Sequence, residues 1–292
     1  MSFVIEDVLV RHDPVGHPDG RRVPVLFDSP HSGTVYPSGF TFACPLALLR
    51  QTEDAFVDEL FAAAPEQGAT LLAALFPRAC VDVNRAVDDI DPAILDGEWP
   101  EPLRPSPRSA HGMGLIRTLC RPGVPLYDGR LPVAEVAERI GRYYHPYHFQ
   151  VSSVLDGLAA RFGGVWHVNC HSMPSRLGWD APRPVGVDFV IGDRDGTSSE
   201  PEFVAFVAAE LRAMGYSVAV NAPFKGVELV GRYANPARNR HAIQVEINRA
   251  LYMDEETLQR HAGFEPLRRA LTTLTARIAD YAEANTIRRA AE

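Results

Sequence analysis

The sequence predicts an α/β protein with a mostly parallel or mixed central sheet and helices on both faces. Short apolar runs of strand length alternate with longer amphipathic stretches, most clearly in the second half of the chain. Glycine and proline, 22 and 24 of the 292 residues, separate many of these segments. Several apolar runs end directly in polar side chains, and in open α/β sheets the ligand lies beyond such strand ends.

In the first half, three apolar runs bounded by turn-forming residues predict strands at 23–27, 70–76 and 79–83. Between the first two, apolar residues recur at helical spacing from Asp54 onward. Thr52 is a candidate N-cap for this helix. The first half therefore begins with strand, helix and strand.

A proline- and glycine-rich stretch over 86–130 lacks sustained periodicity, which predicts an irregular and functional excursion. The pattern is helical over 132–161, with a kink expected before Pro146. The remaining segments alternate, with strands at 165–170, 187–191, 216–220 and 241–247 and helices at 201–214 and 255–284. We expect the whole chain, 1–292, to form a single domain.

Composition and charge narrow the classes of function. With 46% hydrophobic and 23% charged residues, the chain is typical of a soluble globular protein. A formal charge of −8 provides no basic surface for nucleic acid, and no apolar run approaches the roughly 18 residues of a membrane span. The N-terminus does not resemble a signal peptide, and the four cysteines form no C-x-x-C pair and are predicted to be reduced. These features predict a cytoplasmic protein with no nucleic-acid or membrane partner.

Two of the ten histidines stand out as candidate metal ligands. His31, in SPHSG, and His171, in NCHSMPS, each follow an apolar strand and have small or turn-forming neighbours. His145 and His148 are also close in sequence, but the proline between them interrupts a shared helical face, so we interpret them as structural. Both candidate ligands are therefore expected at the carboxyl edge of the sheet.

A catalytic zinc site usually has three protein ligands, so two histidines require a carboxylate as well. Glu53 and Asp54 are the nearest candidates, and their position does not distinguish them from acids of a solvated first helical turn. Glu246 lies in the apolar stretch IQVEINRALY, where burial would raise its pKa toward that of a general base or acid. The alternative for Glu246 is a buried ion pair with Arg249 or Arg85.

Other catalytic patterns are weak or absent. Serines adjoin both candidate histidines, but the chain has no G-x-S-x-G elbow and no glycine-rich phosphate-binding motif. Lys225 is the only lysine, so an anionic ligand would have to be held by that ammonium or by arginines. Arg85, Arg117 and Arg249 could fork onto a substrate carboxylate or could form ordinary ion pairs.

The segments SPHSG, DAFVDEL, VDVNR, NCHSMPS and QVEINRALYMDE together resemble the N-formylglutamate amidohydrolase family, which is similar in fold to the zinc carboxypeptidases. These motifs extend from about residue 25 to residue 256 in the family's order and spacing. The resemblance implies that one zinc ion (Zn²⁺) per chain is bound by His31, Asp54 and His171, and that Glu246 is the catalytic carboxylate. The loop after Lys225 departs from the family pattern and carries Glu228, which would oppose a dianionic substrate if it faced the pocket.

The resemblance further implies a single amidohydrolase domain that hydrolyses the formyl amide of N-formyl-L-glutamate to formate and L-glutamate, a step of histidine breakdown. Glu246 would take a proton from a water molecule activated by zinc, and Arg85 would stabilise the oxyanion. The carboxylates of this small anionic substrate would be held by Asn84, Arg85, Arg117 and Lys225. The alternatives are a zinc amidohydrolase or carboxypeptidase for another N-acyl amino acid or short peptide, and a non-catalytic metal-dependent binding protein. Simple binding gives no reason to keep an acid at position 246.

Overall fold

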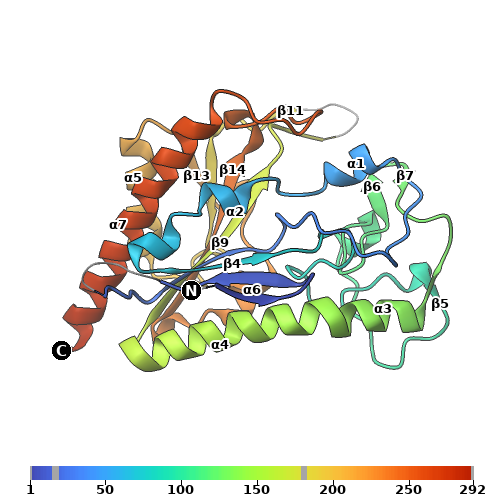
Figure 1. The fold of residues 1–292 in the computed structure, drawn as a ribbon, viewed down its shortest axis with the longest axis horizontal. Coiled ribbons are helices and arrows are strands. Elements are labelled where there is room, and N and C mark those ends of the chain that lie inside the picture. The colour runs from blue at the N-terminus through green and yellow to red at the C-terminus, as the bar shows by residue number, and fades with distance from the viewer. Residues whose placement is uncertain (1, 15–19, 179–182, 291–292) are drawn as a thin grey trace.

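An eight-stranded mixed sheet runs through the protein in a computed structural model that describes residues 2–14, 20–178 and 183–290 (Figure 1). Its strand order is β1-β2-β4-β3-β9-β14-β12-β13. The four central strands, β4, β3, β9 and β14, are parallel, whereas β2 and β12 run antiparallel to them. The strands span β1 Ser2–Ile5, β2 Leu9–His12, β3 Val25–Ser29, β4 Thr70–Ala74, β9 Val165–Met173, β12 Phe189–Gly192, β13 Val218–Val220 and β14 Arg240–Asn248. The predicted fold class is confirmed.

Helices cover both faces of this sheet. In Figure 1, α5 and α7 lie on one side of the sheet and the long α4 lies on the other. The helices span α1 Leu46–Arg50, α2 Val57–Leu60, α3 Val133–Arg139, α4 His145–Phe162, α5 Pro201–Ala213, α6 Glu228–Tyr233 and α7 Phe264–Ala290. A π-helical turn, Ile140–Tyr144, joins α3 to α4, so the α-helical hydrogen-bond pattern changes just before Pro146, where the sequence predicts a kink.

The predicted excursion over 86–130 contains only short elements. These are the 3₁₀ turns Pro92–Ile94 and Ser109–His111 and the strands β5 Leu95–Asp96, β6 Leu119–Arg121 and β7 Val124–Pro125. Elsewhere the short elements are β8 Leu131–Pro132, β10 Arg176–Leu177, β11 Arg183–Pro184 and the 3₁₀ turns Ala64–Gln67, Pro236–Arg238 and Arg249–Leu251. The apolar side chains of the excursion pack with those of α3 and α4 in one core.

Strand β9 shows how the sequence separates a core from a polar face. All nine of its residues are buried, and alternate side chains point to opposite faces of the sheet. Trp166, Val168 and Cys170 pack into the apolar core under α5 and α7. His167, on the opposite face, donates to Asp28, which also accepts the hydroxyl of Tyr147 from α4. The polar face of the central strands therefore lies on the α4 side.

Three predicted elements differ from the structure. The strand at 79–83 is wrong, because this segment forms turns whose Asp82 amide donates to the Leu115 carbonyl rather than to a sheet. The helix predicted from Asp54 is shorter and begins later, as α2, Val57–Leu60. The amide of Asp54 donates to the His31 carbonyl at 2.9 Å and so lies outside the helix. The helix predicted over 255–284 begins only at Phe264, after a series of turns.

The prediction that all four cysteines are reduced is wrong for two of them. Cys44 and Cys120 form a disulfide, whereas Cys80 and Cys170 are free and buried. The spacing of 76 residues between the bonded cysteines gives no local sequence signal for the pairing.

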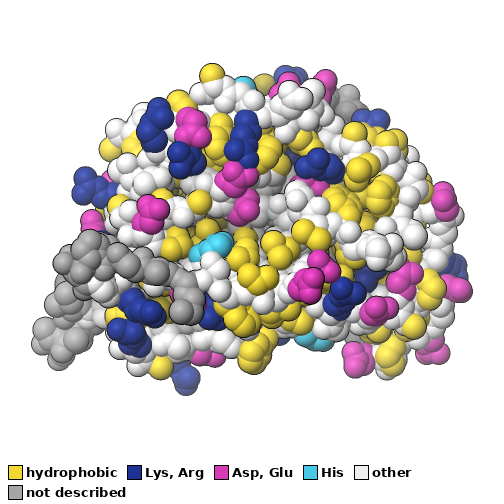
Figure 2. Space-filling view, viewed as in Figure 1, with side chains coloured by type: hydrophobic (Ala, Val, Ile, Leu, Met, Phe, Trp, Pro, Cys, Tyr) yellow, Lys and Arg dark blue, Asp and Glu magenta, His cyan; other side chains and the backbone are white. Residues whose placement is uncertain are grey.

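Figure 2 shows basic side chains interspersed with acidic side chains on the face that it displays. Within the described ranges, no helix is both long enough and apolar enough to cross a membrane.

Candidate metal centre

Three neighbouring parallel strands bring the predicted site residues to one edge of the sheet. His31 lies two residues beyond β3, His171 lies in β9 and Glu246 lies in β14. In the parallel register His171 is the direct partner of Glu246, so their side chains emerge on the same face. Because the carboxyl ends of parallel strands meet at one edge, residues far apart in the sequence converge here.

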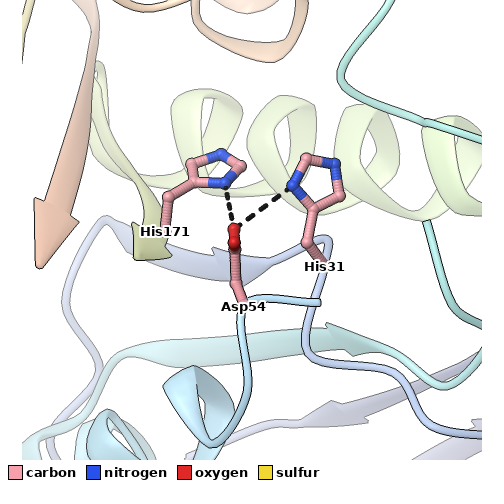
Figure 3. Close-up of side chains that lie close together, drawn as sticks. All are labelled: His31, Asp54 and His171. Carbon is pink, nitrogen blue, oxygen red and sulfur yellow. Dashed lines mark hydrogen bonds and ion pairs between the residues drawn. The ribbon is translucent and has the colours of Figure 1, made fainter. Parts of the chain in front are cut away.

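Asp54 lies between the two imidazoles (Figure 3). Its Oδ2 is 2.9 Å from His171 Nδ1 and 3.3 Å from His31 Nδ1. One ligand atom from each of the three residues falls within 4.8 Å of the others, and all three side chains are buried. Among the described residues they form a group suited to a metal ion, as predicted, whereas His148 bonds to the Val83 carbonyl and the Tyr233 hydroxyl instead.

The outer nitrogens of both imidazoles are fixed by oxygen acceptors. His31 Nε2 lies 2.7 Å from Asp82 Oδ1, and His171 Nε2 lies 2.7 Å from Asn169 Oδ1. An imidazole that keeps its proton on Nε2 and gives up the Nδ1 proton shared with Asp54 carries its lone pair on Nδ1, where a metal ion could bind. Two such nitrogens and one carboxylate are the donor set of catalytic zinc sites, and the carboxylate and amide acceptors are the partners that orient zinc-bound histidines. The residues present therefore fit zinc.

The surroundings of Asp54 favour its ionised form. Burial raises its pKa, but the hydrogen bonds to His171 and His31 and the nearby guanidinium of Arg78 outweigh burial and hold the pKa of Asp54 well below its ordinary range. Arg249 also donates to Asp54 Oδ1 at 3.0 Å. A carboxylate must be deprotonated to bind a metal, so these contacts suit Asp54 to that role.

The neighbouring acid, Glu53, has other partners. Its Oε1 accepts the hydroxyl of Tyr36 at 2.6 Å, and its Oε2 lies 3.5 Å from Arg50 Nε. Of the two carboxylates that the sequence leaves open, the geometry brings Asp54 to the histidines.

Glu246 is buried beside the candidate ligands. Burial and the negative charge of Asp54 raise its pKa, although the charges of His171 and Arg78 oppose this. Gln244 Nε2 donates to Glu246 Oε1 at 2.7 Å. The ion pairs considered as alternatives do not form, because Arg249 pairs with Asp54 and Arg85 donates to the carbonyls of Met113 and Asn84.

Arg117, within the excursion, and Arg85, just before it, lie near the candidate metal-binding residues. Burial and the positive charge of Arg78 lower the pKa of Arg117 to about 9, and its Nε has no hydrogen-bond partner within the described structure. Arg85 lies close enough to Arg78 and Asp82 for their charges to act on it. An array of poorly compensated buried guanidinium groups favours an anionic ligand.

Arg78 is a site residue that the sequence analysis does not identify. Its Nε and Nη2 donate to Asp82 Oδ2 at 3.2 and 2.7 Å, and its Nη1 lies 3.9 Å from Asp54 Oδ1. It thus connects the carboxylate that holds His31 with the carboxylate between the imidazoles. The spacing of four residues between Arg78 and Asp82 is the one sequence signal for this pair, and many surface ion pairs share it.

The remaining predicted substrate residues are placed differently. Asn84 lies in the site, where its Nδ2 is 3.1 Å from His171 Nε2 and its Oδ1 accepts the amide of Leu229 at 3.0 Å. Lys225 is exposed and pairs with Asp195 at 2.8 Å, so the structure does not bring it to the metal ligands. Glu228, the acid that could oppose an anionic substrate, pairs with Arg232 at 3.2 Å.

Known proteins resemble this chain over most of its length. The model of the N-formylglutamate amidohydrolase family matches residues 23–253. Proteins named N-formylglutamate deformylase from Pseudomonas aeruginosa and Pseudomonas putida are 33% and 30% identical to it, over 80% of this chain and 84% and 83% of theirs. The crystal structure of an N-formylglutamate amidohydrolase from Ralstonia eutropha has a TM-score of 0.90 and 47% identity, covering 96% of this chain and 99% of that one. A solved protein of Agrobacterium tumefaciens, 18% identical with a TM-score of 0.66 over 95% of this chain and 96% of its own, shares the fold.

Proposed function

Because the chain belongs to the N-formylglutamate amidohydrolase family, we propose that it hydrolyses the formyl amide of N-formyl-L-glutamate to formate and L-glutamate. The chain is a hydrolase that acts on a linear amide. The observation that carries the specific proposal is the buried group of His31, Asp54 and His171 with Glu246 as the register partner of His171. This arrangement combines a metal-binding set with an adjacent general base.

In the proposed mechanism His31 Nδ1, His171 Nδ1 and an oxygen of Asp54 hold zinc. When bound there, zinc would lower the pKa of a water molecule and polarise the formyl oxygen. Asp82 and Asn169 offer oxygen acceptors to the Nε2 atoms of the two imidazoles, so a metal ion could replace the Nδ1 protons, and the positive charge of Arg78 favours the ionised form of Asp54.

Glu246 is the proposed general base and then the general acid. Its carboxylate takes a proton from the attacking water and returns that proton to the amide nitrogen, so the C–N bond breaks to give formic acid and a neutral amine. The proton that formic acid then loses converts the amine to the ammonium group of L-glutamate. Burial raises the pKa of Glu246, which brings the carboxyl closer to the pH at which one group can both accept and donate a proton.

Different arginines bind the different negative charges of the substrate, which are the oxyanion of the tetrahedral intermediate and the substrate carboxylates. We assign Arg78 to the oxyanion that forms at the formyl carbon, because its Nη1, which makes no bond to Asp82, lies 3.9 Å from Asp54 Oδ1. Arg85, the residue predicted for the oxyanion from the sequence, has Nε and Nη1 engaged by carbonyl groups. We assign its remaining N–H groups and Arg117 to the substrate carboxylates.

Arg117→Met is expected to raise the KM for N-formyl-L-glutamate by about 10- to 100-fold, the equivalent of one charged hydrogen bond, with a smaller change in kcat. The same variant should change the KM for N-formyl-L-glutamine much less if Arg117 binds the side-chain carboxylate. Steady-state formate release with both substrates measures this. The exposed Arg121 serves as control: Arg121→Met should behave as wild type, and an equal KM in all three proteins would contradict the assignment.

Gln244→Met is expected to move the acid limb of kcat/KM to higher pH. The donated hydrogen bond of Gln244 stabilises the carboxylate of Glu246 and lowers its pKa, so losing the donor raises that pKa further. A base with a raised pKa is protonated, and inactive, over a wider acidic range. A pH profile of kcat/KM for both proteins checks the direction, and a shift toward lower pH would rule out Glu246 as the group that titrates.

Metal analysis of the purified protein together with formate release, before and after chelation, tests the proposed function. We expect about one zinc per chain, and activity that disappears with chelation and returns with zinc. N-formylaspartate, N-acetylglutamate and a short peptide should be poorer substrates than N-formylglutamate. Preference for one of these would replace the substrate, and turnover that persists after complete metal removal would refute the mechanism.

A further inference from the structure

A buried arginine that the mechanism does not use holds one oxygen of the Asp54 carboxylate. Arg249 follows β14 directly and is 7% exposed. Its Nη2 donates to Asp54 Oδ1 at 3.0 Å. The other oxygen, Oδ2, is the one that faces His171 and His31, at 2.9 and 3.3 Å. The two oxygens of this carboxylate therefore have different partners.

Three further hydrogen bonds fix the plane of the Arg249 guanidinium. Nε donates to Ser172 Oγ at 3.0 Å, Nη1 donates to the Gln51 carbonyl at 3.0 Å, and Nη2 also donates to the Glu53 carbonyl at 2.7 Å. These bonds join the ends of β9 and β14 to the loop that carries Asp54. A planar guanidinium makes such bonds in fixed directions, which a lysine ammonium cannot reproduce.

We infer that Arg249 is a positioning residue that occupies Asp54 Oδ1 and leaves Oδ2 as the single oxygen available to a metal ion between His31 and His171. The inference rests on the proposed metal site. A catalytic zinc ion needs a coordination position for water beside its three protein ligands. A carboxylate that bound through both oxygens would take up one more position, so holding Oδ1 elsewhere keeps room for the water.

Arg249→Lys tests this role, because it keeps the positive charge near the metal and removes the fork. We expect the zinc affinity, measured by competition with a chromogenic chelator, to fall about 10- to 100-fold. In the Co²⁺-loaded protein, visible absorption should weaken as the freed Oδ1 raises the coordination number. A folded Arg249→Lys protein with the wild-type zinc affinity and Co²⁺ spectrum would overturn the inference.

Two further variants separate positioning from stability. Ser172→Ala removes one bond to Arg249 but leaves the contact with Asp54, so zinc affinity should fall less than in Arg249→Lys. If Arg249→Lys does not fold, Ser172→Ala decides alone, and unchanged zinc binding there overturns the inference. Val207→Ala weakens the apolar core under α5, away from the site, and should keep both zinc readouts.

A loss of zinc affinity in Val207→Ala equal to that in Arg249→Lys would assign the effect to stability and overturn the positioning role. The melting temperature of each variant shows how much stability it has lost, so that losses of zinc affinity can be compared at similar losses of stability. A wild-type protein that binds no zinc would refute the proposed metal site and this inference together. Normal zinc binding by wild type with unchanged variants would refute the positioning role alone.

Discussion

Glu246→Gln should retain zinc at the wild-type level and lose about 10²- to 10⁴-fold in kcat, the range supplied by a positioned general base. The amide has nearly the shape of the carboxyl and can still bond to Gln244, but it cannot take a proton from water. Glu246 lies beside the metal ligands and is not one of the three residues grouped around the candidate site. Metal content and formate release, measured on the same preparation, check both halves of this expectation.

Glu265 provides a matched control for that experiment. It is exposed in the first turn of α7 and pairs with Arg268, so Glu265→Gln makes the same chemical change far from the sheet edge. This variant should keep the wild-type metal content and kcat. Equal turnover in wild type and Glu246→Gln would remove the general-base assignment, whereas zinc-loaded wild type that releases no formate would favour a metal-dependent binding protein.

The central strands could be predicted because they are buried on both faces. Apolar runs identify β3, β4, β9, β12 and β14 closely, since a strand covered on both sides needs a nearly continuous apolar sequence. The strands β1 and β2 are partly exposed and are not predicted from the sequence. The same criterion fails at 79–83, where the apolar side chains are equally buried but lie in turns beneath the excursion. Burial alone therefore does not distinguish a strand from a tightly packed loop.

The candidate metal ligands could be predicted only in part from local sequence. His31 and His171 are recognisable because each lies near the carboxyl end of an apolar strand, although β9 continues past His171 to Met173. The choice between Glu53 and Asp54 depends on the direction of a turn, and the backbone bond from Asp54 to His31 sets that direction. A hydrogen bond between residues 23 positions apart cannot be predicted from the local pattern of apolar and polar residues.

The supporting polar residues are of two kinds. Asp82 bonds to His31 from a distant segment, whereas Asn169 and Gln244 lie two residues before His171 and Glu246 in the same strands, on the same face of the sheet. Asn248, which the sequence places at the same strand end, instead accepts the amide of Ala250 and donates to the Val187 carbonyl. Position at a strand end therefore does not decide between a site residue and a cap, and the residues that support the site need not lie there.

His171→Ala should lose both zinc and activity. Removing one of the three candidate ligands leaves His31 Nδ1 and Asp54, which are too few for a stable catalytic zinc site. Losing a residue that only hydrogen-bonds to a ligand already lowers metal affinity roughly 10- to 100-fold. We therefore expect the metal content after dialysis against a weak chelator to fall below a tenth of the wild-type value. Formate release should fall with it. His145→Ala, an exposed histidine of the same chain, is the control and should retain both properties.

The adjacent carboxylates provide the sharpest form of this test. Asp54→Asn converts a charged ligand that faces both imidazoles into a neutral amide, so zinc content should drop as it does in His171→Ala. Glu53→Gln makes the equivalent change one residue earlier, where the side chain bonds to Tyr36, and should leave zinc bound even if stability falls. The reverse result, zinc lost with Glu53→Gln and kept with Asp54→Asn, would show that the turn at 51–56 presents the other acid to the metal and would transfer the ligand role to Glu53.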